Sequence, residues 1–272
     1  MSLVKEIDRG FKKEEYYGWR AGTNWAKQYI EICNRAVTEK EIFAQFKRTH
    51  AFITILEHVP PSLGEEYLIN ISKNNPELFK LMSIFRAAND SVGNPVLASW
   101  ESFGVTRMSP TTIRYIKVLS DLNTLFGNLD NFNIVEIGGG YGGLCNIIYR
   151  KHKFANYYDI DLPEPLSLAN LYCKHVGIDN FFPTQITKLE ELEDVKIDLV
   201  ISNYAFSECN YETQDVYVEK VLSKAERGYI THNTGVDRQE RTKSIIQNYN
   251  NFRVFDKDLC KKEHPIFVWG EK

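Results

Sequence analysis

A glycine-rich loop offers the first chemistry in this sequence. Five glycines occupy the six positions from Gly138 to Gly143, directly after the apolar run at 133–137. Glycine adopts positive φ readily and carries no Cβ, so a ligand can lie directly against the main chain. A tight turn needs fewer glycines than this, and the loop is therefore predicted to bind a ligand.

Two cofactor patterns fit the loop. Gly138, Gly140 and Gly143 satisfy G-x-G-x-x-G, the dinucleotide fingerprint. The loop also satisfies E-x-G-x-G-x-G, which begins at Glu136 and ends at Gly142. A carboxylate at Glu136 would repel the pyrophosphate of a dinucleotide and attract a cationic ligand, so the E-x-G-x-G-x-G pattern is favoured over the dinucleotide fingerprint.

Two polar residues end the next predicted strands. Asp161 follows the strand expected at 155–160, where its carboxylate can accept hydrogen bonds from ribose hydroxyls. Gln185 ends the strand expected at 181–185, where a side-chain amide can read the edge of an adenine ring. Ligands of such sheets bind beyond the carboxyl ends of the strands, so both residues are expected to contact a nucleoside.

Three stretches, VEIGGGYGGL, YYDIDLPEPLSLANLY and DLVISNYAFSE, resemble the class I S-adenosylmethionine-dependent methyltransferases. The triplet Asp161-Leu162-Pro163 is similar to the DLP of plant-type small-molecule O-methyltransferases, and the interval of 23 residues from Gly138 to Asp161 also fits that family. Within the class, these stretches and the preceding MSPTTIRYIKVLSDL are most similar to bacterial proteins identified as sugar O-methyltransferases.

The resemblance implies S-adenosylmethionine as the methyl donor and S-adenosylhomocysteine as the product. The residues expected at this cofactor are Glu136, Gly138, Gly140, Gly142, Asp161, Gln185 and Asn203. The resemblance also implies a small hydroxylated acceptor, a sugar or nucleotide-sugar, in the synthesis of a surface glycan such as capsule or lipopolysaccharide. No metal is expected, because no histidine has acidic or cysteine partners at ligand spacing.

A sugar hydroxyl is a poor nucleophile at neutral pH, so a general base is expected to accept its proton. In the plant-type enzymes a catalytic histidine stands nine residues after the leading Asp of the fourth strand, a position that Ser207 occupies here, counted from Asp198. The neighbouring Glu208 is the first candidate for the base, and His232, after the fifth strand, is the second. A surface helix-cap acid and a satisfied histidine are the ordinary alternatives for these two residues.

Three further residues are candidates for the acceptor side. Tyr204 is expected to line the cofactor or acceptor pocket with Asn203, unless it is simply a core residue. If the acceptor carries a phosphate, Arg107 and Arg114 are the cations expected to bind it through charge-assisted hydrogen bonds.

Strands and helices alternate from about residue 128 to residue 272, which predicts a doubly wound α/β domain with a mostly parallel, seven-stranded, Rossmann-like sheet. Strands are expected at 133–137, 155–160, 181–185, 198–202, 228–231, 252–256 and 265–269. Helices are expected at 144–152, 164–176, 214–223 and 238–248. The last two strands have no helix between them, so they are expected to pair as an antiparallel hairpin at one edge.

Residues 1–127 are expected to form a helical cap that contributes to the acceptor pocket or to a homodimer interface. Helical periodicity covers 39–59, and a second stretch over 64–86 is expected to break near Asn74-Asn75-Pro76. A third helix is expected at 110–126, with Ser109 as N-cap and Gly127 as its end. The aromatic residues of the first segment are expected in the core or in an interface: Phe11, Tyr16, Tyr17, Trp19, Trp25 and Tyr29.

Composition limits the other classes of protein. The net charge of −3 and a pI of about 6.1 argue against a nucleic-acid partner, and no apolar run is long enough for membrane insertion. Five scattered cysteines without a CxxC pair indicate reduced thiols in a cytoplasmic protein. Two alternatives remain open: a methyltransferase with another N- or O-acceptor, and a catalytically silent S-adenosylmethionine-binding partner subunit. An NAD-dependent oxidoreductase is a further alternative, disfavoured by Glu136 and by the expected terminal hairpin.

Overall fold

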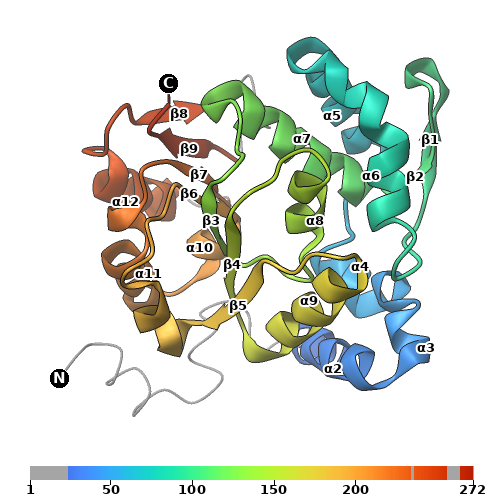
Figure 1. The fold of residues 1–272 in the computed structure, drawn as a ribbon, viewed down its shortest axis with the longest axis horizontal. Coiled ribbons are helices and arrows are strands. Elements are labelled where there is room, and N and C mark those ends of the chain that lie inside the picture. The colour runs from blue at the N-terminus through green and yellow to red at the C-terminus, as the bar shows by residue number, and fades with distance from the viewer. Residues whose placement is uncertain (1–23, 234–235, 256–263, 272) are drawn as a thin grey trace.

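The computed structural model describes residues 24–233, 236–255 and 264–271, and its path is shown in Figure 1. The expectations for Phe11, Tyr16, Tyr17, Trp19 and Cys260 fall outside these residues. None of the helices in the described ranges combines the length and the apolar content needed to cross a bilayer.

A seven-stranded sheet lies at the centre of the molecule, in the order β5-β4-β3-β6-β7-β9-β8. Its strands are β3 (Asn133–Ile137), β4 (Asn156–Asp161), β5 (Phe181–Gln185), β6 (Leu199–Asn203), β7 (Gly228–Thr231), β8 (Arg253–Phe255) and β9 (Ile266–Trp269). The first five are parallel, whereas β9 runs antiparallel to both β7 and β8. The predicted sheet and its terminal hairpin are confirmed.

Helices cover both faces of the sheet, as Figure 1 shows. On one face lie α7 (Pro110–Phe126), α8 (Gly143–Tyr149) and α9 (Pro163–His175); on the other lie α10 (Ala205–Glu208), α11 (Tyr211–Lys220) and α12 (Val236–Ile246). Successive side chains of a strand point to opposite faces, which is why the neighbours Ile134 and Val135 belong to different hydrophobic clusters. Shorter turns of 3₁₀ helix lie at Glu101–Phe103, Ile186–Leu192 and Leu222–Lys224.

The cap consists of short helices rather than long ones. They are α2 (Asn24–Thr38), α3 (Lys40–Phe43), α4 (His50–Ile55), α5 (Pro61–Asn74) and α6 (Met82–Asn89), with 3₁₀ turns at Phe46–Arg48 and Pro76–Leu81. The continuous helix expected at 39–59 is wrong: Thr49 is extended and its hydroxyl accepts from the amide of Phe52, so a new helix begins there. The expected break near Asn75 is confirmed.

A small hairpin was not expected from the sequence. It comprises β1 (Ala98–Trp100) and β2 (Val105–Met108), which pair only with each other in the described sheets. Trp100 packs against Gly64 of α5 and donates its indole N–H to the carbonyl of Pro61 at 3.0 Å. Strands this short have too few residues for a recognisable apolar alternation, so contacts with the rest of the cap decide their conformation.

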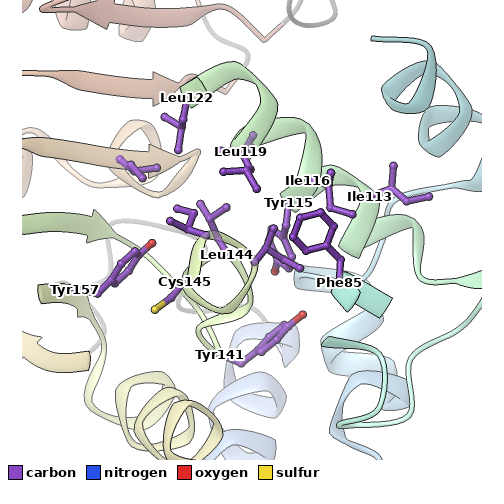
Figure 2. Packing of buried hydrophobic residues seen from close by; sticks show 14 of the residues in the cluster. Phe85, Ile113, Tyr115, Ile116, Leu119, Leu122, Tyr141, Leu144, Cys145 and Tyr157 are labelled. Carbon is purple, nitrogen blue, oxygen red and sulfur yellow. The ribbon is translucent and has the colours of Figure 1, made fainter. Parts of the chain in front are cut away.

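Helix α7 joins the cap to the sheet. Its predicted start and end are confirmed, with the Ser109 hydroxyl accepting from the Thr111 amide and Gly127 ending the helix. In Figure 2, side chains of α7, among them Ile113 and Leu119, belong to one buried hydrophobic cluster together with side chains of the cap and of α8. Because this cluster contains residues of the cap and of α8 and α9, the cap and the α/β domain share a single hydrophobic core.

Candidate donor and acceptor site

The glycine loop lies between β3 and α8, at the carboxyl edge of the sheet. Gly138, Gly140 and Gly142 have φ angles of +80°, +64° and +83°, a region that favours glycine. A Cβ on Gly138 would collide with that of Ala205, and one on Gly142 would lie 2.8 Å from the sulfur of Cys173. The loop therefore needs glycine both for its backbone and for close packing against α9 and α10.

Three acids converge on this loop. The amide of Gly139 donates to Asp159 Oδ1 and that of Gly140 to Asp161 Oδ2, each at 3.0 Å. Glu136 Oε2 accepts from the hydroxyl of Tyr157 at 2.7 Å. Asp159 Oδ2 is buried and has no hydrogen-bond partner within the described part of the chain. Ionising three buried carboxyl groups in one place is costly, and the hydrogen bonds from the protein offset only part of this cost.

Burial raises the pKa values of all three carboxyl groups, and neighbouring acids add to each shift. Burial raises the pKa of Glu136 to about 7, although the bond from Tyr157 acts against the shift. Burial also raises the pKa of Asp161 to about 6, opposed by the amides of Leu162 and Gly140. The pKa of Asp159 is raised well above its usual range by burial and by the other two acids. Each carboxylate would gain from a nearby cation.

The other residues expected at the cofactor lie on the same edge. Gln185 ends β5 directly beside Asp161, its partner in the strand register. Asn203 ends β6, where its side-chain oxygen accepts from the hydroxyl of Thr231 at 3.2 Å and its side chain is near enough to Glu136 to oppose the rise in the pKa of that carboxyl. The structure thus brings together the residues that the sequence predicted at separate strand ends.

Tyr204 follows Asn203 in an unusual backbone conformation. Its φ of +74° is rare for a residue with a side chain and costs about 1–3 kcal/mol, a strain that clusters at functional sites. The ring lies edge-on to that of His264, with centroids 5.5 Å apart. His264 Nδ1 is buried without a partner among the described residues. No sequence signal marks His264 for this edge, because it precedes β9 and belongs to no motif.

Glu208 ends the four-residue helix α10 after β6. Its carboxylate accepts a short hydrogen bond from the side-chain amide of Asn233, which follows β7. Ser207, at the histidine position of the plant-type enzymes, accepts from the main-chain amide of Asn233 at 3.0 Å and donates to the carbonyl of Tyr204 at 2.7 Å. Ser207 therefore ties the segment after β6 to the segment after β7. Glu208 is partly exposed.

His232 is held inside the protein. Its Nδ1 lies 2.8 Å from the carbonyl of Asn233 and its Nε2 lies 2.9 Å from the hydroxyl of Thr242. The residue is fully buried, and burial lowers the pKa of its ring. Because both ring nitrogens are already hydrogen-bonded, this geometry favours a structural role for His232 over the role of a base.

The two arginines expected at the acceptor lie in different places. Arg107 is exposed on β2 of the small hairpin. Arg114 is partly buried in α7, and its guanidinium lies 5.3 Å from the ring centroid of Tyr115. It also interacts electrostatically with Tyr204 and Glu136 at the strand ends. Only Arg114 is thus associated with the carboxyl edge.

The cap supplies neighbours of the loop that sequence reasoning missed. A Cβ on Gly140 would lie 3.1 Å from Leu56 Cδ1 and 3.9 Å from the hydroxyl of Tyr29. The hydroxyl of Tyr141, inside the loop, donates to Glu57 Oε1 at 3.3 Å. No local signal marks these residues, since α2 and α4 reach the loop only in the folded chain. Within the described ranges, no group of three or more His, Cys, Asp or Glu residues could hold a metal ion.

The strand order, with antiparallel β9 inserted between β7 and β8, is that of the class I methyltransferase fold. No family model and no curated protein sequence matches the chain.

Solved structures with similarity to part of the chain include three methyltransferases. A Methanococcus maripaludis protein assigned to the S-adenosyl-L-methionine-dependent methyltransferases has a TM-score of 0.47 and 12% identity, over 58% of this chain and 85% of its own. A SAM-dependent methyltransferase from Aquifex aeolicus has a TM-score of 0.42 and 15% identity, over 57% and 87%. An rRNA methylase from Streptococcus thermophilus has a TM-score of 0.41 and 16% identity, over 52% and 86%.

Proposed function

We propose that the protein is an S-adenosylmethionine-dependent methyltransferase that acts on a hydroxyl group of a sugar or sugar derivative. One observation carries the choice of donor: Glu136, Asp159 and Asp161 converge on the glycine loop with raised pKa values. A cationic ligand offsets the cost of ionising such a cluster, and S-adenosylmethionine is positively charged at both its ammonium and its sulfonium. A dinucleotide would instead bring a negative pyrophosphate to these acids.

The donor's chemical groups match residues along the edge. Each oxygen of Asp161 accepts one backbone amide, from Leu162 or Gly140, and keeps a second lone pair for a ribose hydroxyl. Gln185 is the neighbour that would contact the adenine, and Glu136 the one that would bind the ammonium. When bound, the donor supplies an electrophilic methyl group on its sulfonium sulfur.

On the acceptor side, Glu208 is proposed as the general base. It takes the proton of the acceptor hydroxyl while the oxygen bonds to the methyl carbon and the carbon–sulfur bond breaks. The amide of Asn233 orients its carboxylate, and Tyr204 lines the same side. Alignment of donor and acceptor supplies much of the acceleration in such a displacement, and a helical cap that excludes water assists it. The sugar acceptor itself is supported by the resemblance of the sequence alone.

Calorimetry with S-adenosylhomocysteine and NAD tests the donor. We expect S-adenosylhomocysteine to bind and NAD to give no heat; the reverse result would overturn the proposal. A mass-spectrometric screen of sugars, nucleotide-sugars and other small molecules for methyl uptake then tests the acceptor. Donor binding without methylation of any acceptor would favour a catalytically silent partner subunit.

Donor affinity is expected to depend on pH. A cation favours the ionised form of Glu136, whose pKa of about 7 leaves it increasingly protonated as the pH falls through neutrality. S-adenosylmethionine should therefore bind about tenfold more weakly near pH 6 than near pH 8, with proton release on binding. Titration calorimetry in buffers of different ionisation enthalpy measures both effects. Uncharged 5′-methylthioadenosine is the control, and an equal slope for the two ligands would count against the cation.

Replacing Asp161 with alanine is expected to weaken donor binding by about 1.5–3 kcal/mol, the scale for removing a charged hydrogen-bond partner. Calorimetry with S-adenosylhomocysteine measures the loss, and circular dichroism checks the fold. Asp179→Ala, at an exposed position after α9, is the matched control. Unchanged affinity in Asp161→Ala would assign the ribose to another acid, and Asp159 would be tested next.

A further inference from the structure

Within the described residues, the side chain of Arg114 has no hydrogen-bond or ion-pair partner. Of the described arginines, only Arg107 and Arg114 make no side-chain hydrogen bond or ion pair, and Arg107 is exposed to water. Arg114 is partly buried. A guanidinium stays charged at any physiological pH and offers five N–H donors. Leaving a half-buried guanidinium without an acceptor costs free energy, which a bound anion would offset.

The surroundings hold the guanidinium in place but do not neutralise it. The ring of Tyr115, which is buried and labelled in Figure 2, lies against it at 5.3 Å. Burial acts to lower the pKa of Arg114, yet Tyr115, Tyr204 and other neighbours outweigh this and raise it. These groups favour the charge through space, whereas no contact supplies the planar, paired acceptor that a guanidinium prefers.

The nearest carboxylates are engaged elsewhere. Glu57 of the cap interacts with Arg114 but accepts its hydrogen bonds from Ser109 and Tyr141. Glu136 interacts with Arg114 too, and it accepts from Tyr157. Neither forms an ion pair with Arg114 among the described residues. The positive charge of Arg114 thus interacts with groups of both the cap and the strand ends, and no described residue accepts a hydrogen bond from its guanidinium.

We infer that Arg114 binds an anionic group, a carboxylate or a phosphate, of a substrate at the carboxyl edge of the sheet. This inference rests on the proposed function for the identity of that substrate. Two sources can supply the anion: the α-carboxylate of the methyl donor, whose ammonium would lie at Glu136, or an acidic group on the acceptor. Arg107, exposed on its hairpin, is not part of this site.

Arg114→Gln separates the two sources. The probes are S-adenosylhomocysteine, 5′-methylthioadenosine, which lacks the amino-acid end, and inorganic pyrophosphate added to protein saturated with S-adenosylhomocysteine. If the donor supplies the anion, Arg114→Gln should weaken the binding of S-adenosylhomocysteine at least about tenfold and leave the binding of 5′-methylthioadenosine unchanged. If the acceptor supplies the anion, the binding of both adenosine ligands should be unchanged, while the affinity for pyrophosphate falls by a similar factor.

Arg253→Gln is the matched control, because Arg253 is an exposed arginine on β8 that pairs with Glu271. Arg114→Lys keeps the charge without the fork of donors and should recover only part of the loss. Unchanged binding of all three probes in Arg114→Gln would overturn the inference, as would an equal loss for both adenosine ligands. Wild-type protein that binds neither adenosine ligand would refute the donor assignment, and a pyrophosphate titration of the unliganded protein would then test Arg114.

Discussion

Replacing Glu208 with glutamine should lower kcat for methyl transfer by about 10²–10⁴, the range typical of losing a general base. Glutamine keeps the shape of the side chain and can still accept a hydrogen bond from Asn233, but it cannot take a proton from the acceptor. Donor affinity should change little, because Glu208 lies on α10, beyond the residues proposed to bind the donor. Transfer of labelled methyl from S-adenosylmethionine to an acceptor found by the screen measures the rate.

Glu212→Gln is the matched control, since Glu212 is an exposed acid in the first turn of α11. A rate near that of the wild type in Glu208→Gln would remove Glu208 as the base and leave positioning to drive the reaction. His232→Ala gives the second comparison. The bonds of His232 to Asn233 and Thr242 predict a loss of thermal stability there, not a selective loss of kcat.

The second large effect is expected from Gly138→Ala. An L-residue at a φ of +80° costs about 1–2 kcal/mol, and the new Cβ would also overlap that of Ala205, where overpacking adds about 1–3 kcal/mol. The strain is relieved only if the loop and the start of α10 move apart. Because the loop is the proposed donor site, S-adenosylhomocysteine should bind about 100-fold more weakly or not at all.

Gly177→Ala separates backbone strain from packing. Gly177 also has a positive φ, of +78°, but a Cβ there would meet nothing within 4 Å. This control should therefore lose about 1–2 kcal/mol of stability with unchanged donor affinity. Thermal unfolding measures the first quantity and calorimetry the second. Equal donor affinities in the two variants would show that the close packing of Gly138 is not needed for binding.

Local patterns in the sequence were sufficient to predict the α/β half of the fold. The alternation of apolar runs with helical segments predicted all seven strands of the main sheet. The density of glycines after β3 predicted the loop, and Ser109 with Gly127 marked both ends of α7. Such features depend on residues adjacent in the chain, so they can be inferred before the chain is folded.

Parts of the cap could not be predicted in this way. The helix expected at 39–59 is divided because Thr49 caps a new helix and the Lys47 amide bonds the carbonyl of Gly93, far along the chain. The hairpin β1–β2 likewise depends on Trp100 reaching α5. Helical periodicity records which side chains face a core, but it does not show where a distant contact interrupts the backbone.

The site itself divides between what the sequence determined and what tertiary structure decided. Sequence alone selected Glu136, Asp161 and Gln185, because each lies at or near the end of a recognisable strand and such strand ends meet at one edge. Only the folded chain showed that Asp159 bonds the glycine loop beside Asp161, and only it distinguished Arg114 from Arg107. The physical reason is that the burial and the electrostatic surroundings of a charged side chain depend on neighbours from distant elements. The spacing of a motif contains no information about these neighbours.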